Sequence, residues 1–237
     1  MLTVSARLTG ENNKDYSYRV IKEAIMSLEL QPGKSISEIE LAEVLNLSRT
    51  PIREVMAKLR EEHLVEVFPQ VGTYISKIKP QLVDEASFMR FFLEKEVLKL
   101  ACKSFPYESL LDLKKNVALQ KELIGLKGAE TEFHKLDTKF HHIIYQGNQK
   151  ENVWAAITRL STHYNRIRVL SEMEQSFERA VIQHEQFIQI IENKEEEKVE
   201  KIVKEHILDP IKTWEVLYSD DSPYLDYFEK TPAFLLK

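Results

Sequence analysis

The chain has 237 residues, of which 43% are hydrophobic, and this is enough for one or two globular domains. Its net charge of −5, taken alone, argues weakly against nucleic acid as a partner, although the distribution of charge matters more than the sum. Six glycines and eight prolines are few, which favours long helices over sheets. One cysteine, no apolar signal core and no stretch of about 18 apolar residues predict a cytoplasmic protein without membrane contact.

The N-terminal third begins with an expected flexible arm, residues 1–15, and two predicted helices. Apolar side chains recur on one helical face over residues 16–28, and the turn "QPGKS" follows. Ser37 and Glu40 then stand at capping-box spacing, so a second helix begins there. We expect its buried face to consist of Ile39, Leu41, Ala42, Val44 and Leu45.

The segment "LNLSRTP" interrupts this helical pattern and starts a new helix. Ser48 is a suitable N-cap, and Pro51 falls in the first turn, where its missing N–H costs nothing. The new helix is predicted to run to Leu64. Its expected buried residues are Ile52, Val55, Met56 and Leu59.

The start of the new helix is basic. Arg49, Thr50 and Arg53 lie near its N-terminus, on or beside the outward face. In helix-turn-helix proteins this end enters the major groove, and arginine suits both guanine and phosphate. An ordinary helical hairpin with surface arginines is the alternative.

Two β-prone runs follow, residues 64–68 and 73–78, around a turn that carries Pro69 and Gly72. Helix, helix, turn, helix and hairpin together predict a winged helix-turn-helix domain over residues 16–78. The segment "SKIKP" is then expected to be the place where a change between domains is absorbed.

The remainder is mainly α and predicts an all-α six-helix bundle. This effector domain is expected over residues 79–218, and the tail, residues 219–237, is expected to pack on the protein. The six predicted helices cover 81–104, 107–126, 129–146, 150–172, 175–193 and 195–218.

A metal-binding pattern runs through this bundle. Asp137 and His141 share one helical face at i, i+4 spacing, while His184 and His206 lie on the inward stripes of two later helices. One carboxylate and three imidazoles suit zinc, nickel, manganese or iron. The alternative is that each inward histidine is a core residue bonded to a carbonyl, and His134 could replace one ligand. No ligand role is given to His63, His142 and His163.

Residues 24–75, "AIMSLELQPG…VGTYI", resemble the DNA-binding domain of GntR-family bacterial regulators. The resemblance implies DNA contacts from the recognition helix and from the wing. Gln70 and Val71 stand where many relatives carry a basic residue, so weaker wing contacts are expected. The implied DNA-binding residues are Ser48, Arg49, Thr50, Arg53, Gly72 and Thr73.

The second half resembles the FCD effector domain of the FadR subfamily in "FMRFFLEKEVLKLAC", "LDTKFHHIIYQGNQKENVWAAITRL" and "QHEQFIQIIENKEEEKVEKIVKEHI". Six rather than seven helices is more similar to the VanR-like branch. The positions that match its metal ligands are Asp137, His141, His184 and His206.

Three arginines are candidates for binding an acidic effector. Arg90 matches a family arginine that faces the pocket, although an ion pair with Glu94 at i+4 is the alternative. We assign effector binding to Arg90 and Arg166, and leave open whether Arg166 or Arg168 faces inward.

The sequence therefore predicts a ligand-responsive transcriptional regulator rather than an enzyme. It is expected to be a repressor that binds a near-palindromic double-stranded operator as a homodimer, with a small organic acid at a metal-containing pocket. One alternative is a metal-dependent enzyme, against which no acid is clearly placed as a general base. The other alternative is a purely structural metal.

Overall fold

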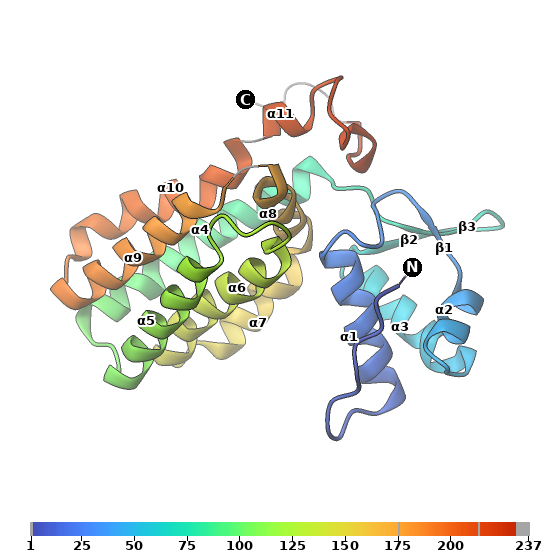
Figure 1. The fold of residues 1–237 in the computed structure, drawn as a ribbon, viewed down its shortest axis with the longest axis horizontal. Helices are drawn as coiled ribbons and strands as arrows, with labels where there is room; N and C mark the ends of the chain where they lie inside the picture. The colour runs from blue at the N-terminus through green and yellow to red at the C-terminus, as the bar shows by residue number, and fades with distance from the viewer. Residues whose placement is uncertain (1, 175, 213, 231–237) are drawn as a thin grey trace. The chain divides into compact units, whose positions relative to one another are not determined.

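The structure is a computed structural model that describes residues 2–174, 176–212 and 214–230 (Figure 1). By their internal contacts these residues form two compact units. Within the described ranges, the first unit holds residues 2–83, 162–166 and 216–230, and the second holds residues 84–161 and 167–215. None of the helices described there is both long and apolar enough to cross a membrane.

The first unit has the winged helix-turn-helix architecture that the sequence predicts. Its helices are α1 (Asn13–Met26), α2 (Glu38–Val44) and α3 (Arg49–Glu61). Its antiparallel sheet has the order β1 (Ser35–Ile36), β3 (Gly72–Ile75) and β2 (Val65–Phe68). Strand β1 was not predicted, because two residues are too short to show an alternating pattern.

The core of the first unit is apolar and is built from all three helices. Leu41, Ala42 and Leu45 of the second helix are buried, but Ile39 and Val44 are 49% and 47% exposed. The prediction that the latter two face inward was therefore wrong. On an ideal helix each points about 110° from the centre of the buried face, so a single stripe cannot include them.

The turn between α2 and α3 is closed by backbone hydrogen bonds. The Leu47 amide donates to the Ala42 carbonyl at 2.9 Å, and the Asn46 amide donates to Glu43 at 3.1 Å. This pattern requires a left-handed residue after the helix, and Asn46 has φ of 53°. Ser48 is then the N-cap residue of α3, as predicted.

The second unit is an all-α bundle, in which α5 packs against α6 and α9, and α9 packs against α10 (Figure 1). Helix α4 starts in the first unit. The elements are α4 (Pro80–Lys103), α5 (Tyr107–Glu122), α6 (Glu130–Gly147), α7 (Glu151–Leu160), α8 (Thr162–Glu174), α9 (Glu178–Asn193), the 3-10 turn η1 (Glu196–Lys198), α10 (Val199–Lys212) and α11 (Trp214–Leu217).

Residues 150–172 form two helices rather than the single helix that was predicted, with the break at Ser161. The first turn of α8 belongs to the first unit. There the Thr162 hydroxyl donates to the Glu62 carbonyl at 3.0 Å, and His163 Nε2 contacts the His63 carbonyl at 3.0 Å. These contacts are distant in sequence, so apolar periodicity could not reveal the break.

The expected arm and the expected tail both belong to the first unit and are held by specific contacts. In the expected arm, Arg19 of α1 donates to the Ser5 hydroxyl and the Ala6 carbonyl. In the expected tail, the Ile78 amide donates to Tyr227 at 2.8 Å and its carbonyl accepts from Glu229 at 2.9 Å. The tail includes the 3-10 turn η2 (Leu225–Tyr227), and its residues 231–237 lie outside the described residues.

Asn46→Val should lower the free energy of unfolding by about 1–2 kcal/mol, because a β-branched residue resists the left-handed conformation. Asn46→Gly should leave it unchanged or raise it. Urea unfolding measures both. The control is Glu43→Val, an exposed helical position where the cost should stay near 0.5 kcal/mol, about the difference in helix propensity. Equal losses at the two positions would contradict this account of the turn.

Candidate metal centre and nucleic-acid interface

The N-terminus of α3 presents the predicted DNA-binding side chains to solvent. Ser48, Arg49, Thr50 and Arg53 are all exposed. The Ser48 hydroxyl makes no capping hydrogen bond, so it is available to an external partner. The Arg53 side chain is 68% exposed, and its Nε lies 3.4 Å from Glu38 Oε2.

The basic residues at the start of α3 do not stabilise the helix. The first turn of α3 contains no acidic residue and begins at Arg49. Cations near a helix N-terminus oppose the macrodipole, at a cost of about 0.3–1 kcal/mol each. A phosphate near Arg49 and Arg53 would offset that cost, because it interacts favourably with both the dipole and the arginines.

The wing has an apolar tip. Val67, Phe68 and Val71 are 48%, 48% and 71% exposed, and residues 65–75 include no lysine or arginine. Gly72 is exposed and Thr73 is half-buried. The structure therefore places both predicted wing residues on the hairpin, next to a tip that has no cation for the phosphate backbone.

The second unit brings together the four residues that the sequence proposes as metal ligands. Asp137 and His141 come from α6, His184 from α9 and His206 from α10, and none is more than 5% exposed. One ligand atom from each of the four lies within 4.8 Å of the others.

The Nε2 atoms of the three histidines face the centre of this group. His141 Nε2 lies 3.0 Å from His206 Nε2. Asp137 Oδ1 lies 3.4 Å from His184 Nε2 and 3.9 Å from His141 Nε2. Imidazole nitrogens and a carboxylate at this spacing form a donor set for a first-row divalent cation.

The opposite nitrogen of each ring, Nδ1, contacts an oxygen of a buried side chain. Such partners hold the ring orientation of metal-binding histidines. The three contacts are His141 with Glu94 at 2.9 Å, His184 with Gln120 at 2.7 Å and His206 with Gln183 at 2.9 Å.

Two of the inward atoms have no hydrogen-bond partner. Among the residues that the structure describes, neither Asp137 Oδ1 nor His184 Nε2 makes a hydrogen bond, although both atoms are buried. A buried polar atom without a partner typically costs about 1–3 kcal/mol. A cation between them would satisfy both atoms, so the residues present fit a metal ion.

Asp137, His184 and His206 are also in the protonation states that a metal requires. Burial lowers the pKa of His184 and holds that of His206 well below its usual range, which favours neutral imidazoles. Burial alone would raise the pKa of Asp137, but Arg168, His184 and His141 together hold it well below the ordinary value. Asp137 is therefore a carboxylate.

The three candidate arginines have different partners. Arg90 is buried in an ion pair with Glu94, with Nε 2.7 Å from Oε1, which was the alternative interpretation of its sequence position. Arg166 belongs to the first unit, where Nη1 donates to the Ser76 carbonyl at 2.7 Å. Arg168 forms the ion pair with Asp137.

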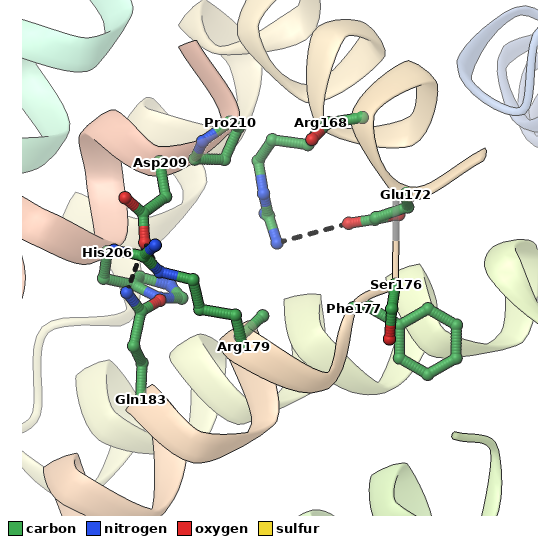
Figure 2. A pocket seen from close by; sticks show the side chains of 11 residues that line it. Arg168, Glu172, Ser176, Phe177, Arg179, Gln183, His206, Asp209 and Pro210 are labelled. Atoms are coloured by element: carbon green, nitrogen blue, oxygen red, sulfur yellow. Dashed lines mark hydrogen bonds and ion pairs between the residues drawn. The ribbon is translucent and has the colours of Figure 1, made fainter. Parts of the chain in front are cut away.

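A cavity of about 80 Å³ opens beside the histidine cluster, between α8, α9 and α10 (Figure 2). Arg168 and His206 line it, and neither Arg90 nor Arg166 is among its lining residues. The exposed side chain of Arg179 also lines the cavity and is ion-paired with Asp209 at 2.6 Å. The cavity thus gives access to one side of the proposed metal ligands.

The remaining histidines lie outside the cluster. His134 Nδ1 lies 3.3 Å from Glu172 Oε2, and the His142 ring stacks on Trp154. His163 is buried, and its Nδ1 accepts from the Lys79 amide at 3.0 Å.

Sequence reasoning missed Gln120 and Gln183 as partners of the histidines. A usable signal was present for Gln120, because Asn116 and Gln120 stand at i, i+4 spacing on the buried face of α5 that also carries Leu113 and Val117. Gln183 immediately precedes a candidate ligand, which is a weaker signal.

Comparisons with known proteins match a different family model to each of two parts of the chain. Residues 17–75 match the family described as "Bacterial regulatory proteins, gntR family", and residues 85–209 match the "FCD domain". An uncharacterized HTH-type transcriptional regulator of Streptomyces ambofaciens is 32% identical over 166 residues, which are 70% of this chain and 69% of that protein. The HTH-type transcriptional repressor RspR of Escherichia coli is 28% identical over 191 residues, 80% and 83% of the two chains.

Solved structures show the same fold. Escherichia coli McbR/YncC superposes with a TM-score of 0.76 at 17% identity, covering 88% of this chain and all of that one. A putative GntR transcriptional regulator from Rhodococcus gives a TM-score of 0.70 at 15% identity, with 84% and 96% covered.

Zn²⁺ or Ni²⁺ at about 100 times its Kd should raise the Tm of metal-free protein by roughly 5–10 °C, because binding to the folded state alone contributes about 2.7 kcal/mol. His184→Ala should abolish both this shift and the bound metal found by elemental analysis. His142→Ala is the matched control on a histidine outside the cluster. Unchanged metal content in His184→Ala would exclude this site.

Proposed function

Because the chain belongs to the GntR family of bacterial transcriptional regulators and carries an FCD domain, we propose that it is a repressor that a small organic acid releases from DNA. Two similar proteins, RspR and the gluconate operon regulator of Bacillus licheniformis, are named repressors. The observation that carries the proposal is the buried cluster of three imidazoles and one carboxylate beside a cavity.

We assign sequence-specific DNA recognition to the exposed N-terminus of α3. Arg49 and Arg53 are suited to guanine and phosphate, while Ser48 and Thr50 supply hydroxyl groups. One recognition helix reads only a short half-site, so we propose a homodimer that places two of them on a near-palindromic double-stranded operator. The wing, at Gly72 and Thr73, then contributes shape and polar contacts rather than ionic ones.

The charges around the cluster favour an anionic ligand. Two buried carboxylates, Asp137 and Glu94, are balanced by two buried guanidiniums, Arg168 and Arg90. A divalent cation (zinc, nickel, manganese or iron) therefore adds two uncompensated positive charges, of which Glu172 offsets one. A bound carboxylate offsets the remainder in a site where unbalanced charge is costly.

The cavity indicates where such an acid enters. Four protein ligands on a six-coordinate cation leave two positions for oxygen atoms of water or of an acid. Arg168 lines the cavity and contacts Asp137, so we assign to it the pocket role that the sequence gave to Arg90 and Arg166. Ser171 and Ser176 supply further hydrogen-bonding groups to the cavity.

Helix α8 offers a route from the cavity to the DNA-binding unit along one continuous helix. Its first turn, which includes His163 and Arg166, belongs to the first unit, and its later turns carry Arg168 and Glu172 of the cavity. The acid must bind one state of the protein more tightly than the other to change DNA affinity. We propose this helix as the coupling element, because the "SKIKP" segment is tied into the first unit through Ser76 and Lys79.

Arg53→Ala should abolish sequence-specific binding to a duplex that the wild-type protein selects from a random library, as measured by fluorescence anisotropy. The side chain is exposed, so the stability should change by no more than about 0.5 kcal/mol. Arg60→Ala, at the opposite end of the same helix, should retain specific binding. Specific binding by Arg53→Ala would refute the assignment of the recognition helix.

Metal-loaded protein should respond to at least one member of a panel of mono-, di- and tricarboxylic acids with a higher Tm and weaker binding to the selected duplex. Arg168→Met should remove this response, whereas Arg159→Met, at an exposed position on α7, should keep it. If no acid changes either quantity, the metal is purely structural. If purified protein turns over an acid, the chain is an enzyme instead.

A further inference from the structure

Two buried glutamines hold two of the proposed ligand histidines by their outer nitrogens. Gln120 is fully buried and Gln183 is 6% exposed. We propose that they are positioning residues, which fix His184 and His206 with Nε2 facing the metal position. The inference rests on the proposed metal-binding function, and it assigns these two residues a role that metal ligation alone does not give them.

The chemistry of the amide group supplies the argument. An amide oxygen only accepts hydrogen bonds, so a histidine Nδ1 that contacts it must carry the proton, and Nε2 then keeps the lone pair that a metal needs. A side-chain amide rotated by 180° would instead present its N–H₂ group to the ring and favour the tautomer with the proton on Nε2. The positioning role therefore requires that neighbouring groups prevent the 180° rotation of each glutamine amide.

Gln120 is fixed by a relay that ends on the backbone. Its Nε2 donates to Asn116 Oδ1 at 2.7 Å, and Asn116 Nδ2 donates to the Leu136 carbonyl at 3.1 Å. A backbone carbonyl can only accept, so this end sets the direction of every bond up to His184. Leu136 directly precedes Asp137, so the relay also ties α5 to the turn of α6 that carries the carboxylate ligand.

Gln183 is fixed by a carboxylate instead. Its Nε2 donates to Asp209 Oδ2 at 2.6 Å, and the same oxygen is 2.6 Å from Nε of Arg179. Figure 2 shows the Gln183 side chain beside His206 and Asp209. A carboxylate accepts and does not donate, so Gln183 must direct its oxygen toward His206 Nδ1, at 2.9 Å.

Neutral amides also have an electrostatic consequence that a carboxylate would not have. Glu94 Oε2 lies 2.9 Å from Nδ1 of His141, and the charge of Glu94 is balanced by Arg90. Glutamate in place of both glutamines would add two negative charges, which exceed the one positive charge that remains at the metal-loaded centre when Glu172 is counted. Gln120 and Gln183 thus orient two imidazoles and leave that excess available to an acidic ligand.

Metal affinity tests the proposal. Gln120→Leu and Gln183→Leu should each weaken Co²⁺ and Zn²⁺ binding by about 10–100-fold in competition with a chelator, the usual effect of losing such a partner. The visible Co²⁺ spectrum should change in both variants, because the ring orientation is no longer fixed. Gln189→Leu, at an exposed position of α9, is the matched control and should bind as the wild type does.

A rescue pair separates positioning from packing. Gln183→Glu places a second carboxylate against Asp209 and should weaken binding. Adding Asp209→Asn keeps the net charge of the wild type and restores a donor opposite residue 183, so the double variant should recover most of the lost affinity. Wild-type affinity in Gln183→Leu, or no recovery in the double variant, overturns the positioning role alone. Absence of metal binding in the wild type overturns the proposed function together with it.

Discussion

The second unit is organised around a buried carboxylate that is balanced mainly by groups from other helices. Asp137 sits on α6 inside an apolar bundle, where an isolated charge would be prohibitively costly. Arg168 of α8 balances its charge, and His184 of α9 and His206 of α10 converge on it. The packing of these helices therefore depends on balancing the charge of one carboxylate, and a cation at the shared centre would balance it further.

The polar groups around this centre divide into an inner and an outer set. In the outer set, Gln120 and Gln183 bond to His184 and His206, and Glu94 Oε2 lies 2.9 Å from His141 Nδ1, so that these contacts hold the imidazole rings before any ligand arrives. Two of the inner atoms, Asp137 Oδ1 and His184 Nε2, lack hydrogen bonds within the described part of the chain. Imidazole rings that are already held from the outside, beside inner atoms without hydrogen bonds, form a site preorganised for binding, because little reorganisation opposes the ligand.

Much of this organisation was predictable from local patterns. The i, i+4 spacing of Asp137 and His141 placed both on one face of a helix, and the inward stripes of two later helices contained His184 and His206. Spacing could not choose between Arg166 and Arg168, because residues two apart on a helix face different directions and both are flanked by apolar side chains. The structure buries both, in different units.

Short-range signals in the sequence therefore indicated the helix-turn-helix and the basic start of α3, and together with the family resemblance they indicated the four clustered ligand candidates. Capping, proline placement and apolar periodicity act over one or two helical turns, and each leaves a readable pattern. The break at Ser161, the burial of α2 and the amide partners of the histidines required the folded chain. They depend on contacts between residues such as Gln120 and His184, which lie 64 positions apart and leave no periodic trace in the sequence.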